Sequence, residues 1–378
     1  MKNNLPVQIM GPASCRPPVM QDTRGAVAVM VAIVMVVLFS FGALALDISN
    51  AMIARNELQN VADASALAGA RQLGMIYQGL PQGTPYTTYV LSDPSAVVSA
   101  ATTVALANQV RQVPIVINAG DIQIGVWHST TRTLAVGNVG ATGVRVTARR
   151  DGGANGPVAT WLAGIMGINT MSITATATAA LTGTGVLLPG ETNAPFGFDQ
   201  VFFNNPAFCN APIQFYPTTT SCAGWHTFLE TPSNANTMRR TIIEGLIPNP
   251  PTYPTPQITS GQTSLEYIGG NLASAFDHPG PSNDLVDLFN AKKVPNSSSP
   301  SGFCWNVTVP VYSTGNTSTC SNPVGNYMTV GAATACVWNV QGTPSQQINA
   351  MVTCGEVTNG QGGGGNFGTL GSIPGLVE

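Results

Sequence analysis

The order of apolar and polar residues divides the chain into one long apolar segment and a longer region of short alternating runs. Residues 26–46, AVAVMVAIVMVVLFSFGALAL, contain no Asp, Glu, Lys or Arg. About 20 residues, each rising roughly 1.5 Å along a helix, cross the ~30 Å hydrocarbon core of a bilayer. A helix is required there because lipid leaves backbone polar groups no other partners. The pattern therefore predicts one transmembrane helix near the N-terminus.

Helical periodicity continues beyond this span. Residues 47–73 contain no Pro and one Gly, and their apolar side chains recur at three- and four-residue steps. Ala, the best helix former, is frequent here. Residues 25–73 are therefore expected to form one segment, a transmembrane helix and its continuation outside the membrane. In it, Ala62, Ala66 and Ala70 form a stripe of small residues, suited either to close contact with another helix or to packing on the protein's own domain.

Residues 74–182 are expected to form an α+β domain, because helical segments flank runs of period two. Helices are predicted at residues 95–111 and 158–166. Residues 172–181, SITATATAAL, alternate Thr with Ala and predict a strand with one face of small side chains. Further strands, each bounded by Gly or Asn, are predicted at residues 115–118, 122–127, 131–136 and 144–149.

A second, strand-rich domain is expected at residues 183–356. It is predicted to begin with a linker at residues 183–205, which are rich in Gly, Pro and Asn. The C-terminal segment, residues 357–378, is expected to be a flexible Gly-rich tail. The predicted fold is thus a transmembrane helix, its extramembrane continuation, and a strand-rich α+β exported region in two parts. A helix is also expected at residues 237–246, with further elements at 264–274 and 308–312.

The charges around the span predict its orientation. Asp47 follows the span, and three basic residues and one acid precede it: Lys2, Arg16, Arg24 and Asp22. The positive-inside rule makes residues 1–24 a cytoplasmic tail and places everything after Leu46 outside the cytoplasm. A cleavable signal is the alternative, because Ala43-Leu44-Ala45 resembles a cleavage site. The apolar core is longer than the usual ~7–15 residues of a signal, which favours an uncleaved anchor.

The low charge of the whole chain also limits its partners. Only 8% of residues are charged and the net charge is -3. Nothing in this composition supplies the basic patch that nucleic-acid binding needs, so no nucleic-acid partner is expected.

The cysteines divide at the span. Cys15 precedes it, and the other six follow it. An even number of cysteines in an oxidising compartment predicts a disulfide framework, although sequence alone does not determine the pairing. Pairing across short loops is favoured, which gives Cys209–Cys222, Cys304–Cys320 and Cys336–Cys354.

No residues stand out for catalysis, a cofactor or a metal. His128, His226 and His278 lie far apart in the sequence, and the chain lacks G-x-S-x-G, H-E-x-x-H and P-loop motifs. Asp63-Ala64-Ser65 begins like a D-x-S-x-S metal motif, but Leu67 occupies the second Ser position. A non-enzymatic protein without cofactor or metal is expected.

Residues 24–73 resemble the N-terminus of TadE/TadG-like Flp (tight-adherence) pilus assembly proteins. The resemblance rests on Arg24-Gly25 before the span, Ala45-Leu46-Asp47 at its end, and RNELQNVADASALAGA at residues 55–70. It implies a single-pass inner-membrane protein with a cytoplasmic N-terminus and a periplasmic or extracellular C-terminal region. Pilin-like members carry Glu at the fifth position of the processed chain, where Met30 stands here when Ala26 is counted as the first.

The function implied by this resemblance is that of a membrane-anchored component assisting Flp/Tad-type pilus assembly or adhesion. Its expected partners are the membrane and pilin or other pilus assembly proteins. Two alternatives come from the residues themselves. One is a surface adhesin released by cleavage of the signal, and the other is an envelope hydrolase with carboxylates brought together by the fold.

Overall fold

The computed structural model describes residues 24–81, 84–215, 222–270, 272–276, 284–316, 318–320 and 322–378. Three features singled out from the sequence lie outside these residues: the predicted cytoplasmic tail up to Thr23, Cys15 within it, and His278.

The chain forms two compact units. The first comprises Met1–Met52 and Ala159–Met171, and the second comprises Ile53–Val158 and Ser172–Glu378. The expected boundary between residues 182 and 183 is not one of these divisions, so the two-part exported region is not confirmed.

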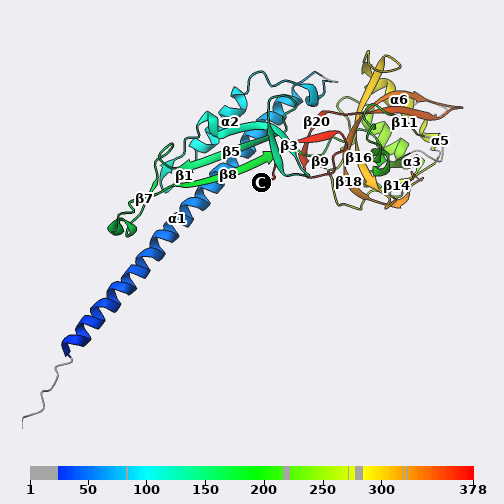
Figure 1. Cartoon of the computed structure of the whole chain (residues 1–378). Coiled ribbons are helices and arrows are strands. Elements are labelled where there is room, and N and C mark those ends of the chain that lie inside the picture. The colour runs from blue at the N-terminus through cyan, green and yellow to red at the C-terminus, as the bar shows by residue number, and fades with distance from the viewer. Residues whose placement is uncertain are drawn as a thin grey trace, which may run out of the picture. The chain divides into compact units, whose positions relative to one another are not determined.

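Helix α1 (Arg24–Gln78) runs without a break through the predicted span and its continuation (Figure 1). In the described part of the chain, it is the one helix long and apolar enough to cross a membrane. The large apolar side chains of the span face outward, with Phe39 74% and Phe41 68% exposed. Such a surface suits lipid rather than water, as expected for a membrane-spanning helix.

After α1 the fold is strand-rich. The first sheet of the second unit has the order β22-β8-β5-β3-β4 and is antiparallel throughout. The continuation of α1 packs on it, since a Cβ added at Gly69 would lie 3.1 Å from Val144 Cγ1 and 3.5 Å from Ala101 Cβ. Ala101 belongs to α2 (Ser95–Leu106). The strands are β3 (Ile122–His128), β4 (Thr133–Val136), β5 (Gly143–Arg150), β8 (Ile173–Ala180) and β22 (Gly375–Leu376).

The predicted Thr/Ala strand is β8. The strand has one face of small side chains, as predicted. Ala175, Ala177 and Ala179 on this face are buried, while Thr174 and Thr176 are exposed. The expectations for residues 122–127, 131–136 and 144–149 are also met, within two residues at each end, by β3, β4 and β5.

A larger sheet has the order β11-β19-β18-β16-β10-β12-β14-β17, with β15 pairing beside β16. Its core gathers aromatic side chains such as Phe196, Trp225, Tyr267 and Tyr312. The strands are β10 (Phe196–Asp199), β11 (Pro212–Phe215), β12 (Ala223–His226), β14 (Glu266–Ile268), β15 (Val294–Pro295), β16 (Phe303–Ser313), β17 (Val324–Asn326), β18 (Met328–Gln341) and β19 (Gln347–Thr353).

Helical segments accompany this sheet. The helix predicted at residues 237–246 is helical from Ala235 to Leu246, with a π-helical middle. The segments are α3 (Ala235–Thr237), η5 (Met238–Ile243), α4 (Glu244–Leu246), α5 (Ala273–Phe276), α6 (Leu285–Lys292) and the 3-10 turn η4 (Gln200–Asn204).

A third sheet, with the order β13-β9-β20-β21, corrects two expectations. The supposed linker contains β9 (Thr184–Leu187) of this sheet and β10 of the larger one. The supposed flexible tail contains all but the first residue of β20 (Glu356–Gly362) and the whole of β21 (Thr369–Ile373). Glycine here permits close backbone approach, because a Cβ at Gly371 would lie 2.6 Å from the carbonyl oxygen of Gly360. The remaining strand is β13 (Ile258–Thr259).

Smaller elements also differ from expectation. Residues 115–118 form no strand, and the helix predicted at residues 95–111 ends at Leu106. The helix predicted at residues 158–166 is instead the short strand β6 (Val158–Ala159) followed by the 3-10 helix η3 (Ala163–Met166). The other short elements are β1 (Gln109–Val110), β2 (Val113–Pro114), β7 (Thr170–Met171), η1 (Tyr86–Thr88) and η2 (Ala119–Asp121).

Candidate functional site at the end of the apolar helix

Asp47 is the first charged residue after the span, and it is almost fully buried, with 4% of its surface exposed. Its carboxylate accepts backbone N–H groups from Trp161 at 2.7 Å, Leu162 at 3.0 Å and Ala163 at 2.6 Å. These N–H groups precede and open η3, where a helix leaves its first donors without internal partners. One carboxylate therefore fixes the loop at residues 160–169, named here the Trp161 loop, to α1 within the first unit.

The hydrogen bonds explain the charge state of Asp47. The backbone N–H of Trp161, and then those of Ala163 and Leu162, hold the pKa of Asp47 below its usual value. Asp47 is therefore a carboxylate at neutral pH. A second hydrogen bond also joins α1 to the start of the loop, because Asn50 Nδ2 donates to the Ala159 carbonyl oxygen at 3.3 Å.

The Trp161 loop presents an apolar surface beside α1. Trp161 is 71% exposed, Ile165 82% and Ile168 54%. A cavity of about 250 Å³ lies between the loop and the helix. Its lining is mostly apolar and comprises Val36, Phe39, Ser40, Ala43, Leu44, Asp47, Leu162, Ala163 and Ile165.

The alanine stripe lies on the other part of α1. Ala62, Ala66 and Ala70 are each fully buried within the second unit. Their neighbour Gly69 faces Val144 of β5 and Ala101 of α2. The stripe thus packs on the protein's own domain. These three alanines are not exposed to contact another helix.

All six cysteines that follow the span form disulfides with one another. The pairs are Cys209–Cys354, Cys222–Cys320 and Cys304–Cys336, with Cα–Cα distances of 5.4, 4.9 and 5.3 Å. The predicted short-loop pairing is therefore wrong.

Strand pairing explains two of the three observed disulfides. Cys304 and Cys336 lie on the neighbouring strands β16 and β18, and Cys209 and Cys354 flank the paired strands β11 and β19. Proximity in the sheet, rather than in the sequence, brings these two pairs together.

The described histidines do not form a site. His128 is exposed at the end of β3, whereas His226 is fully buried and lies edge-on against Phe228 and Tyr267. Burial lowers the pKa of His226 to about 3, so the ring is neutral. Among the residues described, no three His, Cys, Asp or Glu are placed to hold a metal ion. Asp63 instead accepts a hydrogen bond from Gln59 Nε2 at 2.8 Å.

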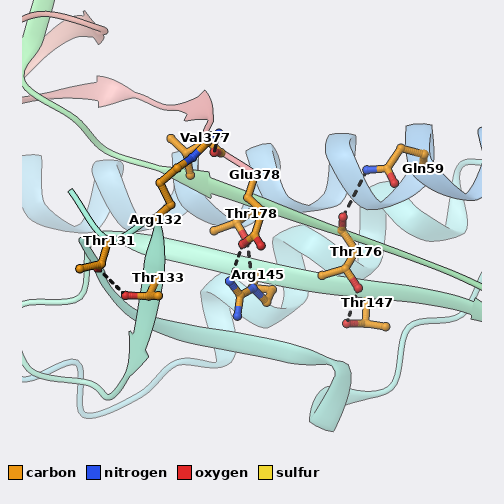
Figure 2. Close-up of polar contacts among 10 residues, drawn as sticks. All are labelled: Gln59, Thr131, Arg132, Thr133, Arg145, Thr147, Thr176, Thr178, Val377 and Glu378. Carbon is orange, nitrogen blue, oxygen red and sulfur yellow. Dashed lines mark hydrogen bonds and ion pairs between the residues drawn. The ribbon is translucent and has the colours of Figure 1, made fainter. Parts of the chain in front are cut away.

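One polar cluster was not anticipated from the sequence. Figure 2 shows Arg145 of β5 bound to the carboxylate of Glu378, which also accepts the Thr178 hydroxyl at 3.1 Å. The pairing of Arg145, and then the contact with Thr178, hold the pKa of Glu378 below its usual value. Backbone hydrogen bonds of 2.9 Å join Thr178 to Val377 and Glu378. The last residues thereby return to the first sheet, and no sequence pattern links positions so far apart.

These features define a class: a chain whose described residues hold one apolar helix that could span a membrane, followed by a strand-rich, disulfide-bonded region. Residues 25–72 match the family described as Flp pilus-assembly TadE/G-like, which confirms the resemblance seen in the N-terminal sequence. The matched segment and the apolar helix fit a membrane-anchored component of pilus assembly. Neither the curated proteins nor the solved structures contain a match to the chain.

Proposed function

We propose that this chain is a non-enzymatic, inner-membrane protein that assists assembly of an Flp/Tad-type pilus, with its second unit outside the cytoplasm. The observation that carries the proposal is the family match at residues 25–72, which coincides with the apolar span and the first turns beyond it. The partners would be pilin or other proteins of the assembly apparatus, bound through the second unit.

Two independent features support the orientation. Basic residues precede the span, and Asp47 follows it. The three disulfides all lie beyond the span, and disulfides persist in oxidising compartments rather than in the cytoplasm. Both features favour a second unit exposed to the periplasm or the cell exterior.

The geometry around Asp47 supports a permanent anchor over a cleaved signal. Helix α1 passes unbroken through Ala43-Leu44-Ala45, the site at which a signal would be cut. Just beyond that site, the Asp47 carboxylate holds the Trp161 loop against the same helix. Cleavage after Ala45 would detach the helix residues that line the cavity beside the loop.

Deleting the gene and restoring it tests the proposed role. Cells that make the pilus should lose surface pili when this chain is absent and regain them when the wild-type chain is supplied. Normal pili without the chain would contradict a role in assembly.

A reporter fused after Glu378 tests the orientation separately. An enzyme that is active only outside the cytoplasm should be active in this fusion, and one that needs the cytoplasm should be inactive. The reverse pattern would overturn the orientation while leaving the pilus phenotype to be explained.

A further inference from the structure

We propose that the Trp161 loop inserts its apolar face into the bilayer leaflet at the Leu46 end of the span, as a second membrane contact beside α1. The inference rests on the part of the proposed function that makes α1 a transmembrane helix. It adds a membrane contact contributed by a segment more than a hundred residues away from the span in sequence.

The position of the loop along the helix is the first argument. The cavity between them is lined by Ile165 from the loop and by helix residues from Val36 to Asp47. Val36 lies about 15 Å before Leu46 at roughly 1.5 Å per residue, which is about half the thickness of a hydrocarbon core. The loop therefore lies beside the part of α1 that the bilayer covers, and a membrane around the helix also surrounds the loop.

The chemistry of the loop is the second argument. No Asp, Glu, Lys or Arg occurs from Gly152 to Gly190, a stretch that contains the whole loop. Its exposed large apolar side chains are Trp161, Ile165 and Ile168, and Gly167 and the uncharged Asn169 are exposed beside them. Trp is enriched where hydrocarbon meets water because its ring is apolar and its N–H is a donor. Large apolar side chains left exposed beside a span mark a contact with lipid or protein.

The backbone of the loop is the third argument. Hydrocarbon offers no partners to polar groups, so an irregular segment can enter it only when its own donors are satisfied. The loop meets this condition over most of its length. The N–H groups of Trp161, Leu162 and Ala163 donate to Asp47, and those of Thr160, Ile165, Gly167 and Ile168 donate to carbonyl oxygens of Asn169, Leu162, Gly164 and Ala163.

Asp47 completes this arrangement. Between Arg24 and Arg55, it is the one acidic or basic residue of the sequence, and it stands directly after the span. A bare carboxylate at this depth would be costly, but the three N–H donors surround its charge. The hydrogen bonds to Asp47 therefore do two things. They hold the loop beside the span, and they shield the charge of the Asp47 carboxylate at the end of the span.

Tryptophan fluorescence of the full chain in lipid vesicles tests the proposal. The signal of Trp161 is obtained by subtracting the emission of the Trp161→Phe variant from that of the wild type. Vesicles of phosphatidylethanolamine and phosphatidylglycerol are prepared with and without bromine on the acyl chains. We expect the brominated lipids to remove most of the Trp161 emission and aqueous iodide to remove little of it. Iodide quenching without bromine quenching would overturn the proposal.

A matched pair of variants at the most exposed loop residue sharpens the test. Ile165→Glu places a charge in the hydrocarbon, and it should shift the Trp161 emission to the red and open it to iodide. Ile165→Leu retains apolar character and should behave as the wild type. Unchanged lipid quenching in Ile165→Glu would contradict insertion of the loop, provided that the variant still forms its disulfides.

Two other outcomes are informative. A chain that fails to float with the vesicles has no membrane span, which overturns both the anchored function and this inference. A chain that floats, but whose Trp161 is open to iodide in vesicles and protected in membranes of pilus-making cells, overturns the inference alone. The last result would assign the apolar face to a protein partner.

Discussion

At the scale of single residues, Asp47 connects the sequence to the architecture most directly. From the sequence it is only an acidic residue that ends an apolar run. In the structure its carboxylate gathers three N–H groups from a loop more than a hundred residues away. Neither spacing nor composition reports such a contact, because the donors are backbone groups that every residue carries.

Replacing Asp47 with Ala should release the loop. Hydrogen exchange of the amides of Trp161, Leu162 and Ala163 should become faster, because their acceptor is gone. Ser49→Ala is the control, since the Ser49 hydroxyl donates only within the helix, to the Ala45 carbonyl oxygen at 2.7 Å. Hydrogen exchange of these amides is measured by mass spectrometry in the protein reconstituted into lipid. Equal protection in Asp47→Ala and wild type would show that the carboxylate does not hold the loop.

His226 predicts how stability depends on pH. Its pKa is about 3 in the folded protein because burial disfavours the charged ring, and about 6.5 when unfolded. The unfolded chain thus binds more protons below pH ~6.5, and stability falls as the pH drops from there toward 3.

The slope from this group is at most about 1.4 kcal/mol per pH unit. His226→Gln should remove it from the free energy of unfolding measured by denaturant at several pH values. His128→Gln, at an exposed position, serves as the control. The same slope in His226→Gln and wild type would contradict this assignment.

At the scale of elements, the predictable parts were those with a regular period. The unbroken apolar run and its alanine-rich continuation became α1, and the Thr/Ala alternation became β8. The errors at residues 183–205 and 357–378 came from composition. Gly, Pro and Asn at residues 183–205 and Gly at 357–378 suggested chain without regular structure, yet β9, β10, β20 and β21 form there. Glycine in a strand can serve close backbone packing, which composition does not distinguish from flexibility.

The alanine stripe provides a test of element packing. Ala66→Leu inserts a larger side chain into a fully buried position, and it should lower the free energy of unfolding by about 1–3 kcal/mol. Ala64→Leu lies on the less buried side of the same helix and should cost less. Denaturant unfolding of the detergent-solubilised protein measures both. Wild-type stability combined with lost pili in Ala66→Leu would instead favour a contact with another protein.

At the scale of the whole molecule, disulfides join distant parts of the sequence. The sequence indicated which cysteines would pair, but not the partners, because strand order is set by the folded sheet. The bond between Cys209 and Cys354 closes a sequence separation of 145 residues. Peptide mapping of the oxidised protein should recover this pair together with Cys222–Cys320 and Cys304–Cys336.

Removing the longest link should be costly. Replacing both Cys209 and Cys354 by Ser should lower the free energy of unfolding by about 2–5 kcal/mol, since a large loop becomes free in the unfolded chain. Thermal unfolding of the double variant beside the wild type checks this. Equal stability of the double variant and the wild type would contradict this role of the bond. In the peptide mapping, a different set of disulfide-linked peptides would contradict the strand order of the larger sheet.

The central claim is that the chain serves pilus assembly as an anchored membrane protein, and one comparison tests both parts of it. Val34→Arg places a charge near the middle of the span, at a cost of about 2.5–3.5 kcal/mol for insertion. Val34→Leu keeps the span apolar. In cells that lack the native chain, Val34→Leu should remain in the membrane fraction and restore surface pili, whereas Val34→Arg should be depleted from the membrane and fail to restore them. Full piliation supported by a soluble Val34→Arg chain would contradict the account.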